Sequence, residues 1–287
     1  MKTSILKTRI CGSILLMLTL FMFSCKKENA SSSNGNPPGG YQLTYGDSVF
    51  YINGGTADYT IQPLQPKTGE YVGYPEGIDI DSKTGAIRVN TSETGLRYRV
   101  TFYPDGATDS FSTNIVISGI NYLDGFYRLN TADSILRPIY NGSFGAAVPG
   151  LNSGTIFDEG SGCNSAGCNV NTVVGTINLA QTVRNGVFGA NPTNNDRHEF
   201  ELEYRINDKS GKALNNIKVK LYYFNSIDDV TPEVYDIISS REGTIFGASP
   251  IAVPFAHYTS VNGVTQVNDR AKVSAKPRPP CIFILGR

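Results

Sequence analysis

The sequence predicts an all-β protein. Only 17% of its 287 residues are charged, and it contains 30 Gly and 16 Tyr, a composition typical of turn-rich β structure. Three segments, residues 97–103, 199–206 and 217–224, alternate apolar and polar side chains, which indicates strands with one buried face. The 25 basic and 25 acidic residues balance each other, which excludes the strongly basic surface of a general nucleic-acid binder.

Residues 1–24 have the pattern of an export signal. Lys2, Lys7 and Arg9, with no acid among them, precede the apolar run 10–23. At about 1.5 Å per residue this run spans about 21 Å as a helix, which is too short for the ~30 Å hydrocarbon core of a membrane. We therefore expect residues 1–24 to be removed, which leaves 22 basic residues against 25 acidic ones.

The end of this leader, Met22-Phe23-Ser24-Cys25, resembles the lipobox of bacterial lipoproteins, although Phe23 is bulky where that family carries a small residue. The resemblance implies cleavage after Ser24 and attachment of lipid, including an acyl chain such as palmitate, to Cys25. Several acyl chains, at ~0.8 kcal/mol per buried CH₂, hold a protein firmly to a membrane. The alternative is an ordinary secretory signal followed by an incidental Cys.

Composition divides the remaining chain into three parts. Residues 25–40 are rich in Ser, Asn, Gly and Pro, which predicts a flexible tether. Residues 41–118 and 119–287 are expected to form two domains, the first a small β-sandwich and the second an antiparallel β-rich domain with one short helix. We expect no repeat of the first domain in the second.

The first domain carries a recognisable pattern. Two short apolar runs flank the turn Asp81-Ser82-Lys83-Thr84-Gly85, and the strand 97–103 follows, with Tyr98, Val100 and Phe102 on one face. Residues 77–102 resemble the immunoglobulin-like or cadherin-like modules of bacterial surface proteins. That resemblance implies a β-sandwich and no particular chemistry.

Asp79 and Asp81 allow two interpretations. Cadherin-type modules bind Ca²⁺ through carboxylates, and the Asp-x-Asp spacing points two carboxylates to one side of a strand. Ca²⁺ takes 6 to 8 oxygen ligands, however, and only two are visible here. Turn chemistry alone explains an Asp four residues before Gly85, so we predict a turn and no metal site.

The second domain contains a predicted hairpin, a helix and a buried strand. Residues 199–206 and 217–224 are expected to pair, with a row of Glu opposite Lys218 and Lys220. Thr231 as N-cap, Pro232 at the first helical position and a stripe of apolar residues predict one helix, ending before Gly243. The stripe consists of Val234, Ile237 and Ile238. The apolar segment 281–285 is expected to be a buried strand.

Cys163 and Cys168 lie in a segment rich in Gly, Ser and Asn. In an exported protein we favour a local disulfide between them, because thiols meet oxidising conditions there. A metal site would need further ligands nearby, and the sequence supplies none. Cys281 is left as a buried free thiol.

The sequence contains no recognisable catalytic or cofactor-binding motif. His198 and His257 are the only histidines, and neither lies near a nucleophile motif. Tyr71, Tyr74 and the segment 222–224 can be interpreted either as platforms for sugar rings or as core residues. We assign no catalytic, cofactor or metal residues.

These observations predict a non-enzymatic, lipid-anchored protein of the cell envelope that acts as a binding or assembly module. Its resemblance to outer-membrane lipoproteins implies a periplasmic or cell-surface location, with glycan capture or association with an uptake complex as its concrete function. The expected partners are the membrane, through lipid on Cys25, and a carbohydrate or another envelope protein, but no nucleic acid. A structural adhesin or fibre subunit is the alternative, and a glycoside hydrolase with two carboxylates from distant strands is a third possibility.

Overall fold

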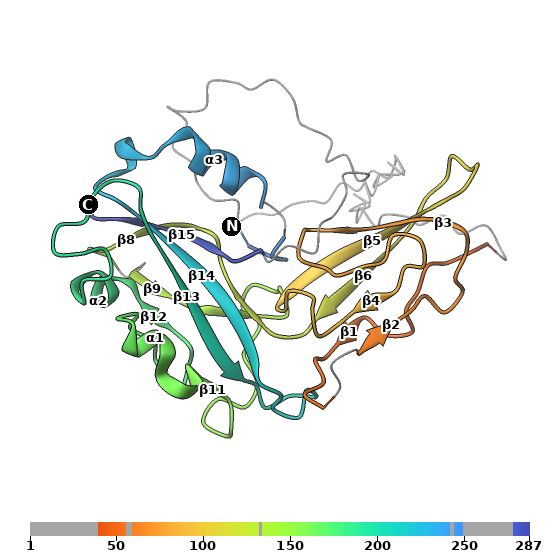
Figure 1. The fold of residues 1–287 in the computed structure, drawn as a ribbon, viewed down its shortest axis with the longest axis horizontal. Helices are drawn as coiled ribbons and strands as arrows, with labels where there is room; N and C mark the ends of the chain where they lie inside the picture. Colours follow the sequence, from red (N-terminus) through yellow and green to blue (C-terminus); the bar gives the residue numbers. More distant parts are fainter. Residues whose placement is uncertain (1–39, 56–58, 132–133, 242–243, 249–277) are drawn as a thin grey trace, which may run out of the picture. The chain divides into compact units, whose positions relative to one another are not determined.

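The computed structural model describes residues 40–287 except 56–58, 132–133, 242–243 and 249–277 (Figure 1). The predicted leader, the predicted lipid site Cys25 and nearly all of the predicted tether lie outside the described residues. Residues 41–287 group into one compact unit. Within it we call residues 41–118 the N-terminal half and residues 119–287 the C-terminal half.

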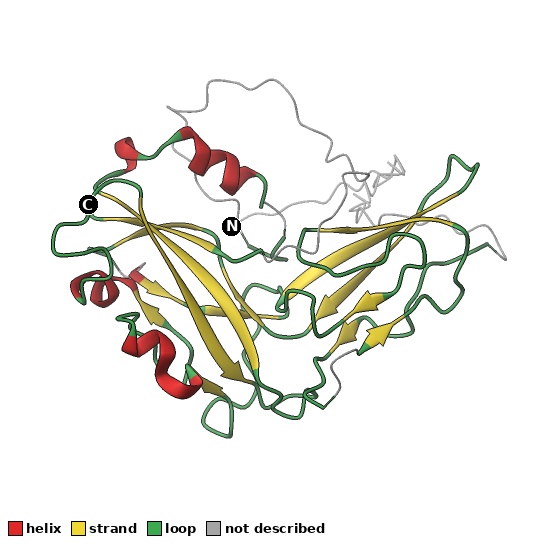
Figure 2. Ribbon diagram, viewed as in Figure 1, coloured by secondary structure: helices red, strands yellow, loops and turns green. Residues whose placement is uncertain are grey.

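The predicted all-β fold is confirmed, because strands dominate both halves and the helices are few and short (Figure 2). The N-terminal half is built on a four-stranded sheet with the order β1-β6-β5-β3. Strand β5 runs antiparallel to both neighbours, whereas β1 runs parallel to β6. A separate antiparallel ladder joins β2 to β4. The bounds are Val49–Phe50 for β1, Thr60–Ile61 for β2, Gly69–Tyr74 for β3, Ile87–Arg88 for β4, Leu96–Pro104 for β5 and Phe111–Ile117 for β6.

The C-terminal half is built on a five-stranded sheet with the order β11-β13-β14-β15-β8. Smaller antiparallel ladders join β7 to β10 and β9 to β12. The bounds are Ile120–Tyr122 for β7, Gly125–Arg128 for β8, Ile135–Leu136 for β9, Pro138–Tyr140 for β10, Ile156–Phe157 for β11, Ile177–Asn178 for β12, Asp196–Arg205 for β13, Asn215–Phe224 for β14 and Cys281–Leu285 for β15.

Strands β13 and β14 form the predicted antiparallel hairpin. Glu199 lies opposite Lys220, and Glu201 lies opposite Lys218. Both lysines reach the same carboxylate, since the Nζ atoms of Lys218 and Lys220 lie 3.1 and 3.6 Å from Glu199. These side chains are about half exposed, so each pair contributes at most about 1 kcal/mol.

The predicted helix is α3, Pro232–Ser239, and it buries Val234 and Ile238 as the apolar stripe requires. Thr231 precedes it as predicted, but its side chain makes no capping hydrogen bond, and its hydroxyl is buried without a partner in the described chain. Two further short helices were not predicted, because each is too short for a periodic pattern. They are α1, Gly162–Ser165, and α2, Leu179–Arg184; two 3₁₀ turns span Glu159–Ser161 and Ile227–Asp229.

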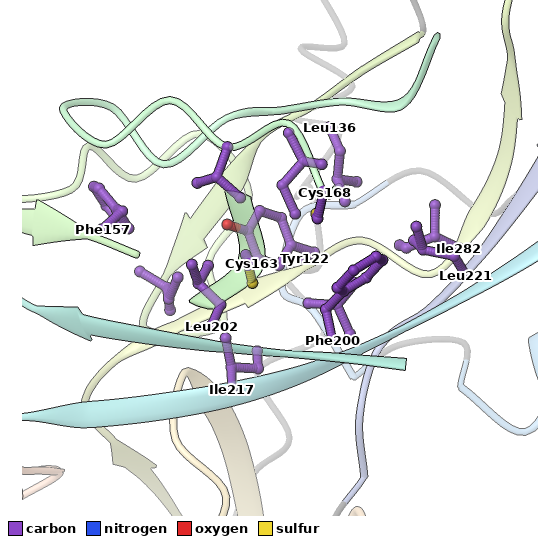
Figure 3. Packing of buried hydrophobic residues seen from close by; sticks show 14 of the residues in the cluster. Tyr122, Leu136, Phe157, Cys163, Cys168, Phe200, Leu202, Ile217, Leu221 and Ile282 are labelled. Atoms are coloured by element: carbon purple, nitrogen blue, oxygen red, sulfur yellow. The ribbon is translucent and has the colours of Figure 1, made fainter. Parts of the chain in front are cut away.

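Strand β15 is buried on both faces, and all five of its residues are at most 2% exposed. Ile282 and Ile284 belong to the large apolar cluster of the C-terminal half (Figure 3). Cys281, Phe283 and Leu285 belong to a second cluster, which they share with the buried side chains of α3. A strand covered on both faces needs apolar residues throughout, which explains the uninterrupted sequence of β15.

The same turn occurs once in each half. In the first, the Asp81 carboxylate accepts hydrogen bonds from the N–H groups of Lys83 and Thr84, at 2.9 and 2.8 Å. The N–H of Gly85 bonds to the carbonyl of Asp81, and Gly85 has a φ of +72°. The predicted turn chemistry at Asp81 is therefore confirmed.

The second turn uses an amide in place of the carboxylate. The side-chain oxygen of Asn171 accepts hydrogen bonds from the N–H groups of Val173 and Val174, at 2.9 and 3.1 Å. The N–H of Gly175 bonds to the carbonyl of Asn171, and Gly175 has a φ of +71°. Both turns thus share one bonding pattern, four residues from the Asx side chain to the glycine.

The surroundings of the two turns also correspond. A tyrosine hydroxyl donates to each turn glycine at 2.7 Å, from Tyr45 to the carbonyl of Gly85 and from Tyr122 to that of Gly175. Strands β4 and β12, which follow the turns, pair with β2 and β9 in the same manner. The expectation that the C-terminal half contains no repeat was therefore wrong at residues 77–89, which correspond to residues 167–179.

Candidate functional site

A buried cluster of one carboxylate and two arginines surrounds the start of β15. Asp124, which directly precedes β8, is 6% exposed in its side chain. Its Oδ1 accepts hydrogen bonds from the N–H of Cys281 at 2.7 Å and from Nη1 of Arg241 at 2.6 Å. Its Oδ2 accepts a longer one, at 3.3 Å, from Arg278.

The two arginines also hold the segment that enters β15. Arg241 donates to the carbonyl of Pro279 at 2.6 Å. Arg278 donates to Thr244 at 3.2 Å, and its Nη1 is buried without a hydrogen-bond partner in the described residues. Burial opposes the charge of Arg241, but Asp124 outweighs that cost and raises its pKa. Removing Asp124 would leave two buried guanidinium groups without their carboxylate.

Glu93 of the N-terminal half lies beside this cluster. Burial raises the pKa of Glu93, while the backbone N–H and the charge of Arg278 and the charge of Arg241 act in the opposite direction. The raised pKa means that the environment as a whole disfavours the ionised carboxylate. Glu93 also lines a hollow of about 180 Å³, together with Gly77, residues 90–92, Thr94 and residues 215–218.

A second hollow, of about 290 Å³, lies along β13 and β14. It is lined by Arg197, His198, Glu199, Lys220, Leu221 and Tyr222. The Arg197 guanidinium lies 5.0 Å from the ring centroid of Tyr222 and also pairs with Glu233 at 3.0 Å. Each of the two hollows is lined by a single carboxylate, whereas glycoside hydrolysis uses two. In the described residues neither hollow therefore provides that pair.

The histidines and the aspartates considered from sequence lie elsewhere. His198 is on β13 with its ring 4.4 Å from that of Phe200, and His257 lies outside the described residues. The Asp79 carboxylate receives two hydrogen bonds from Arg88, each at 2.8 Å. Burial disfavours its charge, but Arg88 and Thr91 outweigh that and lower its pKa. Over the described ranges, no three His, Cys, Asp or Glu side chains gather as a metal site would require.

Cys163 and Cys168 lie together in the large apolar cluster of the C-terminal half (Figure 3). Both are free thiols at 1% exposure. A hydrogen bond with Cys163, together with burial, raises the pKa of Cys168. Cys168 occupies the place that Ile78 takes in the first repeat, so it also serves as a core residue. The disulfide between the two remains a prediction that their proximity permits.

Most of the aromatic side chains considered for sugar stacking are core residues. Tyr71, Tyr222 and Phe224 are at most 6% exposed. Among the large apolar side chains of the described residues, the exposed rings are instead Phe144 and Phe246, at 56% and 62%. Backbone pairing brings the two together, since the N–H of Phe144 bonds to the carbonyl of Phe246 at 2.8 Å. The sequence signal was weak, because the two rings are about 100 positions apart and neither belongs to a cluster of aromatic residues in the sequence.

One arginine of β5, Arg97, completes this surface. The Arg97 guanidinium lies 5.1 Å from the ring centroid of Phe246, within the range of a cation–π contact. We call Arg97, Phe144 and Phe246 the aromatic platform. It presents two exposed aromatic rings and one positive charge, which lies over the ring of Phe246.

Comparison with known protein families and with curated protein sequences found no match to this chain. None of the helices in the described ranges has the length and apolar character needed to cross a membrane.

Proposed function

We propose that the protein is a lipid-anchored component of the cell envelope that acts by binding and assembly. The leader and the lipobox-like segment before Cys25 support the anchor. The observation that carries the assembly role is the polar cluster at Asp124. It binds the backbone of the segment that enters β15 and the side chain of Arg278 in that segment, and the side chains of Asp124 and Arg278 are only 6% and 5% exposed.

The anchor is tested by replacing its cysteine. Cys25→Ala should abolish labelling with radioactive palmitate and should release the protein from the membrane fraction, since one or more acyl chains would be lost. Cys11→Ala is the matched control. Cys11 lies in the apolar part of the leader, so its replacement should leave labelling unchanged. Labelled, membrane-retained Cys25→Ala protein would refute the lipid anchor.

The aromatic platform favours one version of the binding role, the capture of glycans. Exposed flat rings can stack on the C–H faces of sugars, and a nearby guanidinium can hydrogen-bond to their hydroxyls. On a broad glycan array, the chain starting at Lys26 should bind, and the double variant Phe144→Ala, Phe246→Ala should not. Lack of binding to every glycan would reject glycan capture and leave association with another envelope protein.

A further inference from the structure

The two halves differ in how their main sheets close, and the C-terminal half has a slot one strand wide, between β8 and β14, which β15 of the same chain fills. In the N-terminal half β1 pairs directly with β6, in parallel. In the C-terminal half β8 corresponds to β1, because it precedes β9 as β1 precedes β2, and β14 corresponds to β6, because it pairs with β13 as β6 pairs with β5. Strands β8 and β14 do not pair with each other. Strand β15 lies between them and is parallel to both (Figure 1). The main sheet of the N-terminal half thus has no strand between β1 and β6, whereas the main sheet of the C-terminal half contains β15 between β8 and β14.

The slot holds its strand by both backbone edges and at both ends. At the entrance the carbonyl of Pro280 accepts the N–H of Lys220 at 2.9 Å, and Asp124 accepts the N–H of Cys281 at 2.7 Å. At the exit Leu285 and Gly286 bond to Leu129 and Phe224, at 3.0 and 2.9 Å. A strand bound in this way is recognised as peptide-binding proteins recognise an added β-strand, by main-chain bonds and by pockets for alternate side chains.

The recognition extends to specific side chains. Ile282 and Ile284 enter one apolar cluster, and Cys281, Phe283 and Leu285 enter the other. Arg278 is met by the carboxylate of Asp124 and the hydroxyl of Thr244. Residues 278–285 therefore contain all the side chains named above that the slot contacts, and every copy of the chain carries one such segment.

Chain length does not determine which copy supplies the strand. Twenty-nine residues, 249–277, separate the preceding described residue, Ala248, from Arg278. At 3.3–3.6 Å per residue they can span up to about 100 Å. Such a reach is sufficient for the strand to enter the slot of its own chain or that of a neighbouring molecule.

We propose that residues 278–285 are an exchangeable strand, and that a second copy of this chain inserts it between β8 and β14. Exchange replaces one set of contacts by an identical set, so it costs little and links copies through the slot. The strand of the same chain competes for the slot at the millimolar effective concentration typical of a tethered segment. Exchange between copies therefore becomes favoured when the protein itself reaches a comparable concentration. The inference rests on the assembly role proposed above and supplies its partner.

A disulfide between neighbouring strands distinguishes the two sources of the strand. Lys220 on β14 is the register partner of Cys281 on β15. One copy of the chain from Lys26 carries Lys220→Cys and Cys281→Ser, and the other keeps both native residues. The copies are unfolded, mixed and refolded at about 1 mM, a concentration that matches the tethered competitor. After oxidation, a covalent heterodimer should form on a non-reducing gel, since only an exchanged strand brings the two thiols together.

Two controls make the result decisive. Asn216→Cys replaces Lys220→Cys in the first; Asn216 is exposed and points to the same side of β14, about 13 Å further along the strand. In the second, both copies carry Cys281→Ser. Heterodimer yield about tenfold above both controls supports exchange at that concentration. Yield equal to the controls overturns the proposal, whether or not a single chain with Lys220→Cys and native Cys281 forms its internal disulfide.

This experiment is independent of the lipid anchor, because the chain from Lys26 lacks Cys25. Retained labelling of Cys25→Ala would refute the anchor and leave exchange intact. A failed cross-link would refute exchange and leave the anchor and the aromatic platform intact.

Discussion

The two halves of the molecule use the same turn and ladder but complete their sheets from different parts of the chain. The N-terminal half draws all four strands of its main sheet from residues 49–117. The C-terminal half needs a strand that follows its neighbour β14 by more than 50 residues. The comparison shows that a shared local architecture does not decide whether a half depends on a remote segment. That dependence resides in β15 and in the residues that bind it.

The largest expected effect on stability comes from removing the contacts that Asp124 makes with β15 and with the two arginines. Asp124→Ala should lower the free energy of unfolding by about 3–5 kcal/mol, because it leaves the buried charges of Arg241 and Arg278 uncompensated. Urea unfolding followed by circular dichroism measures the loss. Asp79→Ala, which removes a carboxylate paired with the more exposed Arg88, should cost much less. Equal losses for the two variants would contradict the special role of Asp124.

The turn glycines test whether the repeats are equivalent. A Cβ on Gly85 would lie 2.6 Å from the ring of Tyr71, and one on Gly175 would lie 2.6 Å from the ring of Phe157. Positive φ and overpacking together should cost each alanine variant about 2–4 kcal/mol. Gly211→Ala is the control, since Gly211 has a φ of +64° but open space at its Cβ, and should cost only the backbone term. Clearly unequal losses at Gly85 and Gly175 would argue against equivalence.

The cysteine pair has no counterpart in the N-terminal half. Under oxidising conditions Cys163 and Cys168 should form a disulfide, which intact mass spectrometry detects as a loss of two hydrogens. Closing so short a loop should stabilise the fold by about 2 kcal/mol according to the chain-entropy model. Cys163→Ala should remove both the mass change and the sensitivity of unfolding to a reducing agent. A fully reduced wild-type chain after prolonged oxidation would reject the pair.

The tyrosine contacts give a smaller effect. Tyr45→Phe and Tyr122→Phe each remove one buried hydrogen bond to a turn glycine, which should cost about 0.5–1.5 kcal/mol by leaving the carbonyl without that partner. Thermal or urea unfolding of both variants measures the difference. Because the two bonds have the same length, 2.7 Å, we expect similar losses. Loss at one position alone would show that the two turns differ in their environment.

The smallest effect concerns pH at Glu93. Its pKa is raised in the folded protein, so the folded state keeps the proton at pH values where the unfolded state has lost it. Stability from this group is therefore present below the unfolded pKa, near 4.5, and declines as pH rises through the folded value. Glu93→Gln should flatten this decline in urea midpoints measured above pH 4. An unchanged profile would show that Glu93 does not contribute to it.

Strand periodicity predicted much of the fold. Alternation located β5, β13 and β14, and the apolar run at 281–285 correctly indicated a buried strand. What periodicity cannot supply is the partner and direction of a fully apolar strand, so the parallel position of β15 between β14 and β8 was not foreseen. The division into two domains and the immunoglobulin-like resemblance of the first remain predictions.

The repeat and the candidate site were harder to predict. Between residues 77–89 and 167–179 only two glycines and one isoleucine are identical, because Asn can replace Asp as a turn acceptor and Cys can replace Ile in a core. The polar cluster around Asp124 could not be predicted from the sequence for a different reason. Asp124, Arg241 and Arg278 are separated by more than 30 residues each, and nothing in an isolated Asp or Arg signals that it will be buried.

The position of β15 in chain order also sets a schedule for folding. Synthesis delivers the chain from the N-terminus onward, so the N-terminal half can pair all its strands while later residues are still emerging. In the C-terminal half the facing edges of β8 and β14 stay unpaired until β15, which ends at residue 285, has been synthesised. Until then the C-terminal half presents hydrogen-bonding edges that any nearby strand can bind, and chaperone protection during synthesis would matter most for this half.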